Sequence, residues 1–468
     1  FVKTCVPGLD DVIPGFPEGG LILVSGNPGS VKTIMSMTFI YRGALEAGEP
    51  GIYVSAYESE RRFLQLAKRL GMDFEKLEKR GLFRYLSLPT LLENGVSGLL
   101  MEILDAADSM RAKRLVIDPF TTISRAFKDE AEARAFLHTL LSNIVGRLGC
   151  VALLVKEELG PGTGYGFEDY VADALICLKA VRLEDRLLRE MSFLKTRGIE
   201  TRSPDICVTL HGGFKMLPRQ RVPRPPSSPS FNPPQDPPGA YTTGIPELDE
   251  ELGGFPHDSI ILWEIDPRLS FHEYSLAVAP ALASFLAKNR PYIVLPSAGV
   301  TWRDVRDLYV KYYGISEDKL SNLLNVLTMG PIEAEPPPYV KLLKGRSWQE
   351  IFEEFAEIVH SLARERGRHI VRLIGADTLM ATFGENTFKF LDRWVGCFKK
   401  TGGLAMWVVK PVHPHLVRML SPMVDMHLKV TKKHGCILLY GKKPETPLYA
   451  LQPDPEKNAL VPKITPIL

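Results

Sequence analysis

Short apolar runs alternate with stretches of helical length along the first half of this chain. We interpret six of the runs as β-strands: Leu21–Ser25, Ile52–Ser55, Leu115–Asp118, Val151–Val155, Ala174–Leu178 and Met191–Lys195. Several are apolar at consecutive positions, as expected for strands that helices cover on both faces. The pattern predicts an α/β fold with a mainly parallel central sheet, whose ligands bind beyond the carboxyl ends of the strands.

Several motifs at the start of the chain recur at an offset of 239 residues. Thr4–Asp10, which reads TCVPGLD, recurs as Thr243–Asp249, which reads TGIPELD. A looser echo relates Val171–Asp173 to Met423–Asp425. Two copies of one domain therefore follow each other along the chain.

A proline-rich segment separates the two copies. It holds nine prolines between Pro218 and Pro238 and shows no apolar periodicity. Such a segment forms neither a helix nor the interior of a sheet, and it favours an extended, semi-rigid conformation. We therefore predict an N-terminal domain at 1–216, a linker at 217–240 and a C-terminal domain at 241–468.

The composition is that of an ordinary globular protein, with 45% hydrophobic and 24% charged residues. No apolar run reaches the roughly 18 residues that a membrane span needs. The formal charge of +2 gives no argument for non-specific nucleic-acid binding. Six scattered cysteines form no C-x-x-C pair, which favours reduced thiols. We expect a cytoplasmic protein without a membrane partner.

A glycine-rich loop follows the first predicted strand and has the sequence Gly26-Asn27-Pro28-Gly29-Ser30-Val31-Lys32-Thr33. The order of strand, loop, Lys-Thr and helix is that of a P-loop, which binds nucleotide phosphates. Backbone N–H groups at the turn and at the helix N-terminus form a concave anion site. Lys32 would contact the β- and γ-phosphates, and Thr33 would ligate Mg²⁺.

Val31 departs from the P-loop pattern, which has glycine directly before the lysine. If the backbone there requires a positive φ, a β-branched residue is an outlier, strained by on the order of 1–3 kcal/mol. We therefore expect nucleotide binding here and only slow turnover.

Four other charged residues are candidates for the same site. Asp118 ends an apolar strand and is suited to hold Mg²⁺, although a capping aspartate gives the same pattern. Glu58 follows the second strand, where it would orient or deprotonate the attacking water, or simply lie in solvent at a helix start. Lys195 and Arg197 lie at the end of another strand and would meet a γ-phosphate, or form a solvated basic turn.

At these positions the chain resembles the KaiC branch of the RecA-type P-loop ATPases. Besides the P-loop, the matching segments are Thr4–Asp10, Tyr53–Ser59, Leu115–Asp118, Tyr165–Asp173 and Lys195–Gly198. The resemblance covers nearly all of the first half, and tandem copies are known in that family. It implies RecA-like domains that assemble as homo-oligomeric rings, usually hexamers, with ATP between subunits. It also implies that Lys195 and Arg197 act in trans on the neighbour's nucleotide.

Three departures from the family pattern point to weakened hydrolysis. The family has two adjacent glutamates after the second strand, the first serving as the base, and here Tyr57 takes that position so that only Glu58 remains. Tyrosine, with an ordinary pKa near 10, is a poor base at neutral pH. Val31 replaces the last P-loop glycine, and Cys5 replaces the glycine common in the opening motif.

The second half has lost the phosphate site. The 239-residue offset places Ile265–His272 on the P-loop, with Phe271 in place of the lysine and His272 in place of the threonine. Ser297 takes the position of Glu58. A strand resembling that of Asp118 remains at Val371–Asp377, and we expect Asp377 to be structural. We predict a pseudo-ATPase domain that does not bind ATP in the P-loop manner.

The sequence therefore favours a KaiC-like protein that binds ATP/ADP and Mg²⁺ in its N-terminal domain, hydrolyses ATP slowly and acts as a switch or assembly factor. Its protein partner is not evident. Two alternatives stay open: a scaffold that binds nucleotide without hydrolysis, and a recombinase-like nucleic-acid protein, whose local support is Arg219, Arg221 and Arg224.

Overall fold

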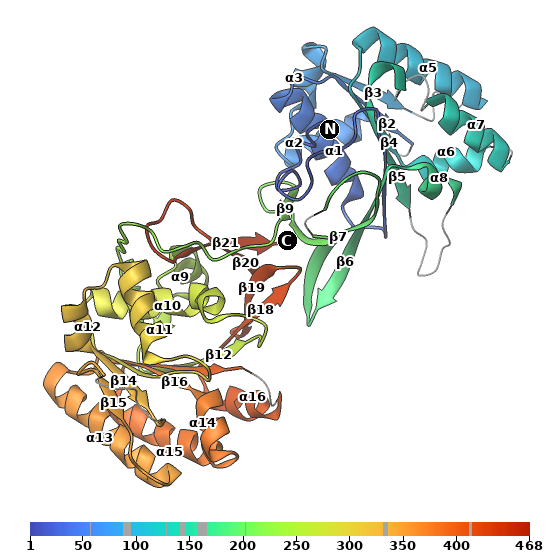
Figure 1. Ribbon diagram of the computed structural model, residues 1–468. Coiled ribbons are helices and arrows are strands. Elements are labelled where there is room, and N and C mark those ends of the chain that lie inside the picture. Colours follow the sequence, from blue (N-terminus) through green and yellow to red (C-terminus); the bar gives the residue numbers. More distant parts are fainter. Residues whose placement is uncertain are drawn as a thin grey trace. The chain divides into compact units, whose positions relative to one another are not determined.

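The computed structural model of the chain describes residues 1–56, 58–87, 95–127, 129–140, 146–157, 166–201, 203–330, 336–410 and 414–468. Tyr57 and Tyr165, both part of the motifs above, lie outside these residues. The chain divides into two compact units (Figure 1), formed mainly by Phe1–Arg219 and by Gln220–Lys433 with Ile437–Pro466. We refer to them as the N-terminal and the C-terminal unit.

One sheet forms the centre of the N-terminal unit, and among the described residues its strand order is β3-β2-β4-β5-β1-β6-β7-β8-β9. The strands are β1 (Leu21–Gly26), β2 (Gly51–Ser55), β3 (Phe83–Ser87), β4 (Arg114–Asp118), β5 (Val151–Glu157), β6 (Ala174–Leu183), β7 (Arg186–Thr196), β8 (Asp205–Thr209) and β9 (Lys215–Leu217). The six predicted strands are confirmed. The first six strands in this order, β3-β2-β4-β5-β1-β6, pair in parallel. β7, β8 and β9 then extend the sheet with antiparallel pairing.

Helices cover both faces of this sheet. They are α1 (Lys32–Glu46), α2 (Glu60–Arg69), α3 (Phe74–Lys79), α5 (Gly95–Met110), α6 (Phe120–Ala126), α7 (Glu130–Leu140) and α8 (Phe167–Val171). The apolar residues of α1, α2 and α3 form one core cluster with the sheet, and those of α5, α6 and α7 form another on the opposite face. This arrangement explains why β1, β2 and β4 are buried at every position.

The C-terminal unit repeats the plan. Among the described residues its main sheet has the order β15-β14-β13-β16-β17-β12-β18-β19-β20-β21. The strands are β12 (Ser259–Ile265), β13 (Tyr292–Leu295), β14 (Leu324–Thr328), β15 (Val340–Leu342), β16 (Val371–Gly375), β17 (Leu404–Val409), β18 (Met426–Lys433), β19 (Cys436–Lys443), β20 (Leu448–Pro453) and β21 (Pro462–Ile467), besides the short pair β10 (Ala240–Tyr241) and β11 (Phe255–Pro256). The prediction of an α/β fold with mainly parallel sheets is confirmed for both halves.

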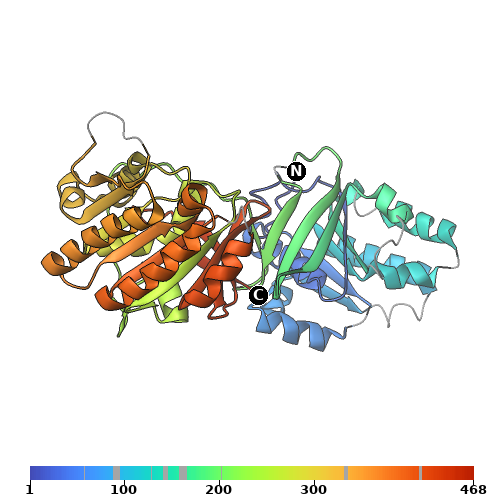
Figure 2. The same ribbon diagram turned by 90° about the horizontal axis from the view of Figure 1, so that it is seen from below.

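Helices again lie on both faces of the C-terminal sheet (Figures 1 and 2). One face carries α10 (Phe271–Ala287), α11 (Trp302–Asp307), the π-helix Leu308–Tyr312 and α12 (Glu317–Leu323), and α9 (Pro246–Leu252) joins the same core cluster. The other face carries α13 (Trp348–Arg366), α14 (Ala376–Phe383), α15 (Asn386–Thr401), α16 (Pro414–Leu420) and the short 3-10 helix Ser421–Met423.

The repeated motifs make the same contacts in both units. The Asp10 carboxylate accepts a hydrogen bond from the Thr4 amide at 2.9 Å, and Asp249 accepts one from the Thr243 amide at 2.6 Å. An aspartate therefore closes the opening loop of each copy.

The weaker repeat, Val171–Asp173 and Met423–Asp425, also makes the same contact in both units. The Asp173 carboxylate accepts a hydrogen bond from the Leu21 amide at 2.9 Å, and the Asp425 carboxylate accepts one from the Ile260 amide at 2.8 Å. Each contact fixes the amino end of the central strand, β1 or β12, to the segment that enters the next strand.

The proline-rich segment has neither helix nor strand from 218 to 239, yet it packs on the C-terminal unit. The Phe231 ring meets the Tyr313 ring edge-on at 5.1 Å. The Asp236 carboxylate accepts hydrogen bonds from Lys288 Nζ at 2.7 Å and from an Arg290 amino group at 2.6 Å. Much of the segment is thus an ordered strap rather than a free spacer.

Within the residues described above, no helix combines the length and apolar character needed to cross a bilayer.

Candidate functional site

The predicted P-loop joins the carboxyl end of β1 to the start of α1. Gly26 has φ 150°, and a Cβ there would lie 2.1 Å from the Leu178 carbonyl oxygen, so a side chain is excluded. Gly29 has φ 77°, a conformation that favours glycine. The glycines are therefore required by the path of the loop around the place where phosphate would lie.

Lys32 is buried beneath this loop. Its Nζ donates hydrogen bonds to the carbonyls of Gly26 at 2.7 Å and Asn27 at 3.0 Å, and lies 3.4 Å from Ser30 Oγ. The side chain thus curls back toward the loop that it follows. Phosphate oxygens would offer this ammonium group charged acceptors in place of neutral carbonyls, and charge-assisted hydrogen bonds are roughly twice as strong.

Val31 adopts the backbone conformation that the pattern assigns to glycine. Its φ of 67° and ψ of 22° lie in the left-handed region, and it caps α1 without a side-chain hydrogen bond. The P-loop conformation is therefore kept although glycine is absent. A β-branched residue in this region costs on the order of 1–3 kcal/mol.

Thr33 and Asp118 form the candidate Mg²⁺ site. Thr33 Oγ1 donates a hydrogen bond to Asp118 Oδ2 at 2.7 Å, and the Tyr53 hydroxyl donates to the same oxygen at 2.6 Å. Burial raises the pKa of Asp118, while these two hydrogen bonds act in the opposite direction. A hydroxyl and a carboxylate next to the loop are the hard oxygen ligands that Mg²⁺ prefers, so these residues fit the ion.

Glu58 lies just beyond β2, between Asp118 and the first turn of α2. Its amide donates to Ser55 Oγ at 3.3 Å, and the Tyr85 hydroxyl donates to its carbonyl. Burial and the nearby Asp118 raise the pKa of the Glu58 carboxyl, and Arg62 opposes the shift. A raised pKa brings a carboxylate closer to the strength that a general base needs at neutral pH.

Lys195 and Arg197 lie near the amino end of β1, whereas the P-loop follows the carboxyl end of the same strand. The Arg197 amide donates to the Asp173 carbonyl at 2.7 Å, and the Asp173 amide donates to the carbonyl of Leu21, the first residue of β1. Gly26 ends the same strand, so Arg197 is about 16 Å from it along the strands and about 10 Å across them. The structure does not bring these cations to the P-loop of their own chain.

The two cations are held together by the end of α8. Lys195 Nζ donates to the carbonyls of Asp169 at 2.9 Å and Tyr170 at 2.8 Å, and Arg197 donates to the Tyr170 carbonyl at 2.7 Å. Burial and the adjacent Arg197 lower the pKa of Lys195. The two cationic groups therefore lie side by side at the Tyr170 carbonyl, and the Tyr170 side chain is exposed next to them.

In the C-terminal unit an internal ion pair replaces the phosphate loop. Asp266, at the position of Asn27, accepts hydrogen bonds from the Arg268 guanidinium at 2.6 Å and from Thr431 Oγ1 at 2.9 Å. Ser270 caps α10 together with Glu273. The backbone and side-chain groups that would meet phosphate are thus bound to one another.

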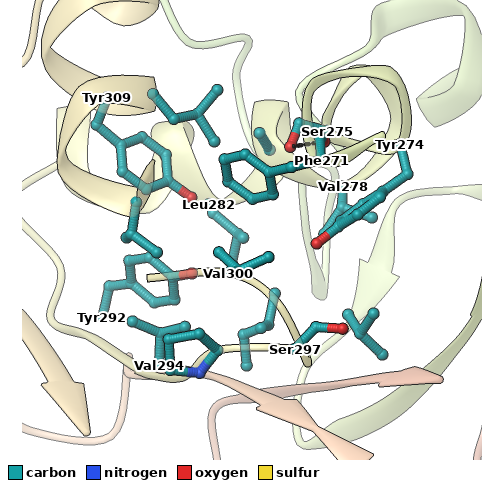
Figure 3. A pocket seen from close by; sticks show the side chains of 16 residues that line it. Phe271, Tyr274, Ser275, Val278, Leu282, Tyr292, Val294, Ser297, Val300 and Tyr309 are labelled. Carbon is teal, nitrogen blue, oxygen red and sulfur yellow. Dashed lines mark hydrogen bonds between the residues drawn. The ribbon is translucent and has the colours of Figure 1, made fainter. Parts of the chain in front are cut away.

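The rest of that pseudo-site is apolar. The two sheets align when Leu21 of β1 is placed on Ile260 of β12, and the strand register then places Leu115 of β4 on Arg372 of β16. Gly375, the last residue of β16, therefore stands where the Asp118 carboxylate would be. Phe271, Leu373 and neighbouring side chains line an apolar cavity of about 30 Å³ (Figure 3).

Asp377, the residue that the strand pattern singled out, lies elsewhere. β16 ends at Gly375, and Asp377 belongs to α14, where it accepts hydrogen bonds from Ser297 Oγ and the Ala298 amide. Ser297, which the sequence offset paired with Glu58, is thus a structural donor. The strand register, which places Ile52 on Ile293, corrects that pairing and puts Gly299 at the position of Glu58.

Comparison with known proteins fits this geometry. Residues 2–211 match the family described as KaiC ATPase. The UPF0273 protein of Sulfurisphaera tokodaii is 30% identical over 216 residues, which cover 42% of this chain and 74% of that protein. The chain belongs to the KaiC-like ATPase family.

Other KaiC-like proteins match in part. The circadian clock oscillator protein KaiC of Synechococcus elongatus is 29% identical over 274 residues, 56% of this chain and 51% of that protein. The chain thus spans about half the length of the clock KaiC proteins that it matches. The crystal structure of a KaiC-like protein from Pyrococcus horikoshii OT3 is 32% identical, with a TM-score of 0.42, and covers 46% of this chain and 98% of that one.

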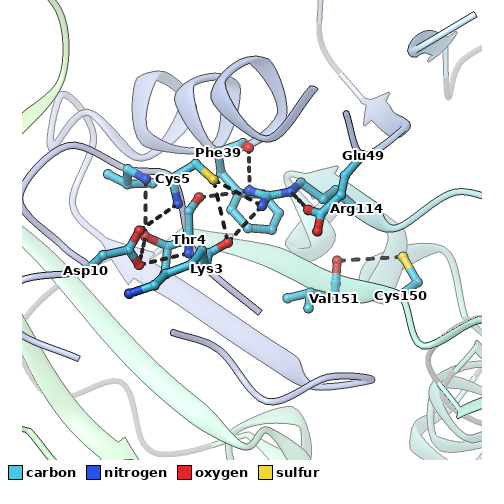
Figure 4. Close-up of polar contacts among 10 residues, drawn as sticks. Lys3, Thr4, Cys5, Asp10, Phe39, Glu49, Arg114, Cys150 and Val151 are labelled. Carbon is cyan, nitrogen blue, oxygen red and sulfur yellow. Dashed lines mark hydrogen bonds and ion pairs between the residues drawn. The ribbon is translucent and has the colours of Figure 1, made fainter. Parts of the chain in front are cut away.

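Cys5, the third departure from the KaiC pattern, also keeps a glycine conformation. Its φ is 56°, and its counterpart Gly244 has φ 79°. The Cys5 Sγ lies 3.5 Å from the Arg114 guanidinium (Figure 4). Arg114 is fully buried and donates to the Thr4 and Phe39 carbonyls, each at 2.8 Å, so this segment is anchored to the start of β4.

Proposed function

We propose that the N-terminal unit binds ATP or ADP with Mg²⁺ and hydrolyses ATP slowly. The observation that carries the proposal is the convergence of three residues: buried Lys32 closes the P-loop, and Thr33 next to it contacts Asp118 at the end of β4. Lys32 and the loop amides would bind the phosphates, and Thr33 and Asp118 would hold the ion. Bound Mg²⁺ would supply charge neutralisation of the phosphate oxygens.

Glu58 is the proposed base. It follows the carboxyl end of β2, on the side of the sheet where the ligand lies, and it is electrostatically coupled to Asp118. In this position it would orient the attacking water and accept its proton. Hydrogen bonds to Ser55 and Tyr85 hold the amide and the carbonyl of Glu58, so the backbone from which its carboxylate extends is fixed.

We further propose that Lys195 and Arg197 complete the site of a neighbouring subunit. Their position at the other end of the strands from the P-loop supports this role, since an arginine side chain is too short to reach the P-loop of its own chain. Their shared anchor at the end of α8 keeps both charges pre-positioned for developing phosphoryl charge. A head-to-tail contact of this kind forms a closed ring when its rotation closes, and the resemblance to the family favours a homo-oligomeric ring, usually a hexamer, with nucleotide at each interface.

Slow turnover suits a switch or assembly factor. Val31 holds the loop in a strained conformation, and Tyr57 replaces the first glutamate of the family pair, so that only Glu58 remains. An ATP state that persists for long periods would bias assembly or the binding of a partner protein.

Strain at Val31 also supports a second candidate, a scaffold that binds nucleotide without hydrolysis. Phosphate release over hours, compared between the parent and Glu58→Ala, separates the two. A parent rate well above that of Glu58→Ala is expected for the enzyme, and equal background rates would show the scaffold. Lys32→Ala should abolish nucleotide binding, and binding as tight as the parent's would refute the site itself.

A further inference from the structure

Two tyrosines on neighbouring strands reach both halves of the proposed site. Tyr53 on β2 and Tyr85 on β3 are direct register partners, and their rings lie parallel, with centroids 6.4 Å apart and planes 5° from parallel. The Tyr53 hydroxyl donates to Asp118 Oδ2 at 2.6 Å, and the Tyr85 hydroxyl donates to the Glu58 carbonyl. The pair therefore links the metal ligand to the proposed base.

Aromatic packing fixes both rings. Phe63 of α2 contacts Tyr53 with a centroid distance of 4.7 Å and Tyr85 at 5.1 Å, and its ring also stacks on Phe83 at 5.8 Å. Tyr53 is 1% exposed and Tyr85 is 8% exposed. Side chains packed in this way hold their hydroxyls in place without further loss of conformational freedom.

The hydrogen bond from Tyr53 anchors the Asp118 carboxylate in one orientation. Thr33 and Tyr53 donate to the same oxygen, so rotation of the carboxylate breaks both hydrogen bonds. Thr33 is itself a proposed ligand of the ion, whereas Tyr53 lies behind Asp118 on the neighbouring strand. Tyr53 is thus the donor that serves orientation alone.

The C-terminal unit provides an internal comparison. In the corresponding strand β13 the register places Val294 at the position of Tyr53, and Gly375 stands at the position of Asp118. The buried Tyr292 of the same strand has its hydroxyl hydrogen-bonded to Tyr309. At these positions the C-terminal unit therefore replaces both the tyrosine and the carboxylate, and Tyr292 is a buried tyrosine outside the proposed site.

We propose that Tyr53 and Tyr85 are positioning residues of the ATPase site, Tyr53 for the Mg²⁺ ligand Asp118 and Tyr85 for the base Glu58. This inference rests on the proposed function. Partners that orient a metal ligand typically change metal affinity by about 10- to 100-fold when they are removed. Tyr53 is therefore expected to govern the Mg²⁺ requirement, and Tyr85 the rate of hydrolysis.

The test uses the full chain with Tyr53→Phe, Tyr85→Phe and the matched control Tyr292→Phe, all of which keep the ring. ADP binding is measured calorimetrically in EDTA and then across a Mg²⁺ titration, and Mn²⁺ binding by electron paramagnetic resonance reports on the ion directly. Tyr53→Phe should bind metal-free ADP like the parent but need about tenfold more Mg²⁺ or Mn²⁺. Tyr85→Phe should keep the parent's metal requirement and release phosphate several-fold more slowly.

The results separate the two proposals. A Tyr53→Phe protein with the parent's metal requirement overturns the role of Tyr53, and one that also loses metal-free ADP binding shows a merely structural role. An effect of the same size in Tyr292→Phe likewise overturns it. An unchanged rate in Tyr85→Phe overturns the role of Tyr85. A parent that binds no ADP at any Mg²⁺ concentration overturns the proposed function, and the tyrosine roles with it.

Discussion

Gly375 ends β16 at the register position at which Asp118 ends β4 in the other unit. A glycine supplies no carboxylate for Mg²⁺, and Phe271 stands in place of the P-loop lysine. We therefore expect one nucleotide per chain. Calorimetric titration with ADP and Mg²⁺ should give a stoichiometry near one, and Lys32→Ala should give none. Phe271→Ala, which opens space in the pseudo-site, should leave the stoichiometry at one, whereas two nucleotides per parent chain would contradict the assignment.

Replacing Val31 with glycine should stabilise the N-terminal unit. The substitution removes left-handed strain of on the order of 1–3 kcal/mol, and the greater freedom of glycine in the unfolded chain offsets about 0.5–1 kcal/mol of that gain. We expect a net gain of about 1 kcal/mol, measured by calorimetric unfolding without nucleotide. Val31→Ala keeps a Cβ at this φ and should gain less. Equal gains for alanine and glycine would show that the backbone conformation is not the cause.

Subunits that carry different defects should complement each other. Lys32→Ala removes the nucleotide site but keeps Arg197, and Arg197→Ala does the reverse. If Arg197 acts on a neighbour, an equal mixture that exchanges subunits should recover about one quarter of the parent's phosphate release, since one interface in four combines both intact parts. Mixing Arg197→Ala with the Lys32→Ala, Arg197→Ala double variant serves as the control. Recovery in that control, or none in the first mixture, would refute action in trans.

Asp236 should hold the proline-rich strap on the C-terminal unit. Its carboxylate is partly buried between Lys288 and Arg290, and hydrogen bonds from both lower its pKa despite burial, which alone would raise it. Asp236→Ala leaves two cations without this partner and should cost about 1–3 kcal/mol. All five tryptophans lie between Trp263 and Trp407, so tryptophan fluorescence in urea reports on this unit alone. Gln235→Ala, the exposed neighbour, should change nothing, and equal curves for both variants would contradict the role of Asp236.

Acid should destabilise the C-terminal unit through Glu264. Burial alone would raise the pKa of this carboxyl, but hydrogen bonds from His427, Lys429 and Lys442 lower it from 4.5 to about 2. A carboxyl with a lowered folded-state pKa contributes stability above the unfolded value, and this contribution is lost as the pH falls from about 4.5 to about 2. We expect a loss of about 2–3 kcal/mol over this range in tryptophan-monitored urea unfolding.

Glu264→Gln tests that pH dependence directly. The variant should be less stable at pH 7, because Lys429 and Lys442 lose their charged partner, and should show a shallower decline in acid. Glu456→Gln, at an exposed position, should follow the parent at every pH. A decline as steep in Glu264→Gln as in the parent would assign the acid sensitivity to other carboxyls.

The sequence predicted the features that depend on local pattern. The six strands follow from consecutive apolar residues, and the P-loop follows from an unbroken segment of eight residues. The glycine pattern raised a positive φ at Val31 as a condition, and the structure shows that the loop adopts it, with φ 67°. The repeat was visible because the motif that ends in Asp10 recurs, together with its aspartate, as the motif that ends in Asp249.

Features that depend on pairing between distant strands were not predictable in this way. Tyr53 and Tyr85 are 32 residues apart, and only the register of β2 and β3 reveals that they face each other. Asp377 stood out because an acid follows an apolar strand, whereas the register assigns the position of Asp118 to Gly375. The sequence marked the strap as extended, but its partners Lys288 and Arg290 lie more than 50 residues away.

The opposite placement of Gly26 and Arg197 on one sheet has a consequence for how such chains would associate. Each molecule carries the P-loop at the carboxyl end of β1 and the pair Lys195 and Arg197 near the amino end of that strand. If these cations complete the pocket of a neighbour, a linear row of molecules ends with one pocket that no cations reach and one pair of cations that reaches no pocket. Only a closed ring completes every pocket, so the molecule that closes the ring would form two interfaces and complete two pockets at once.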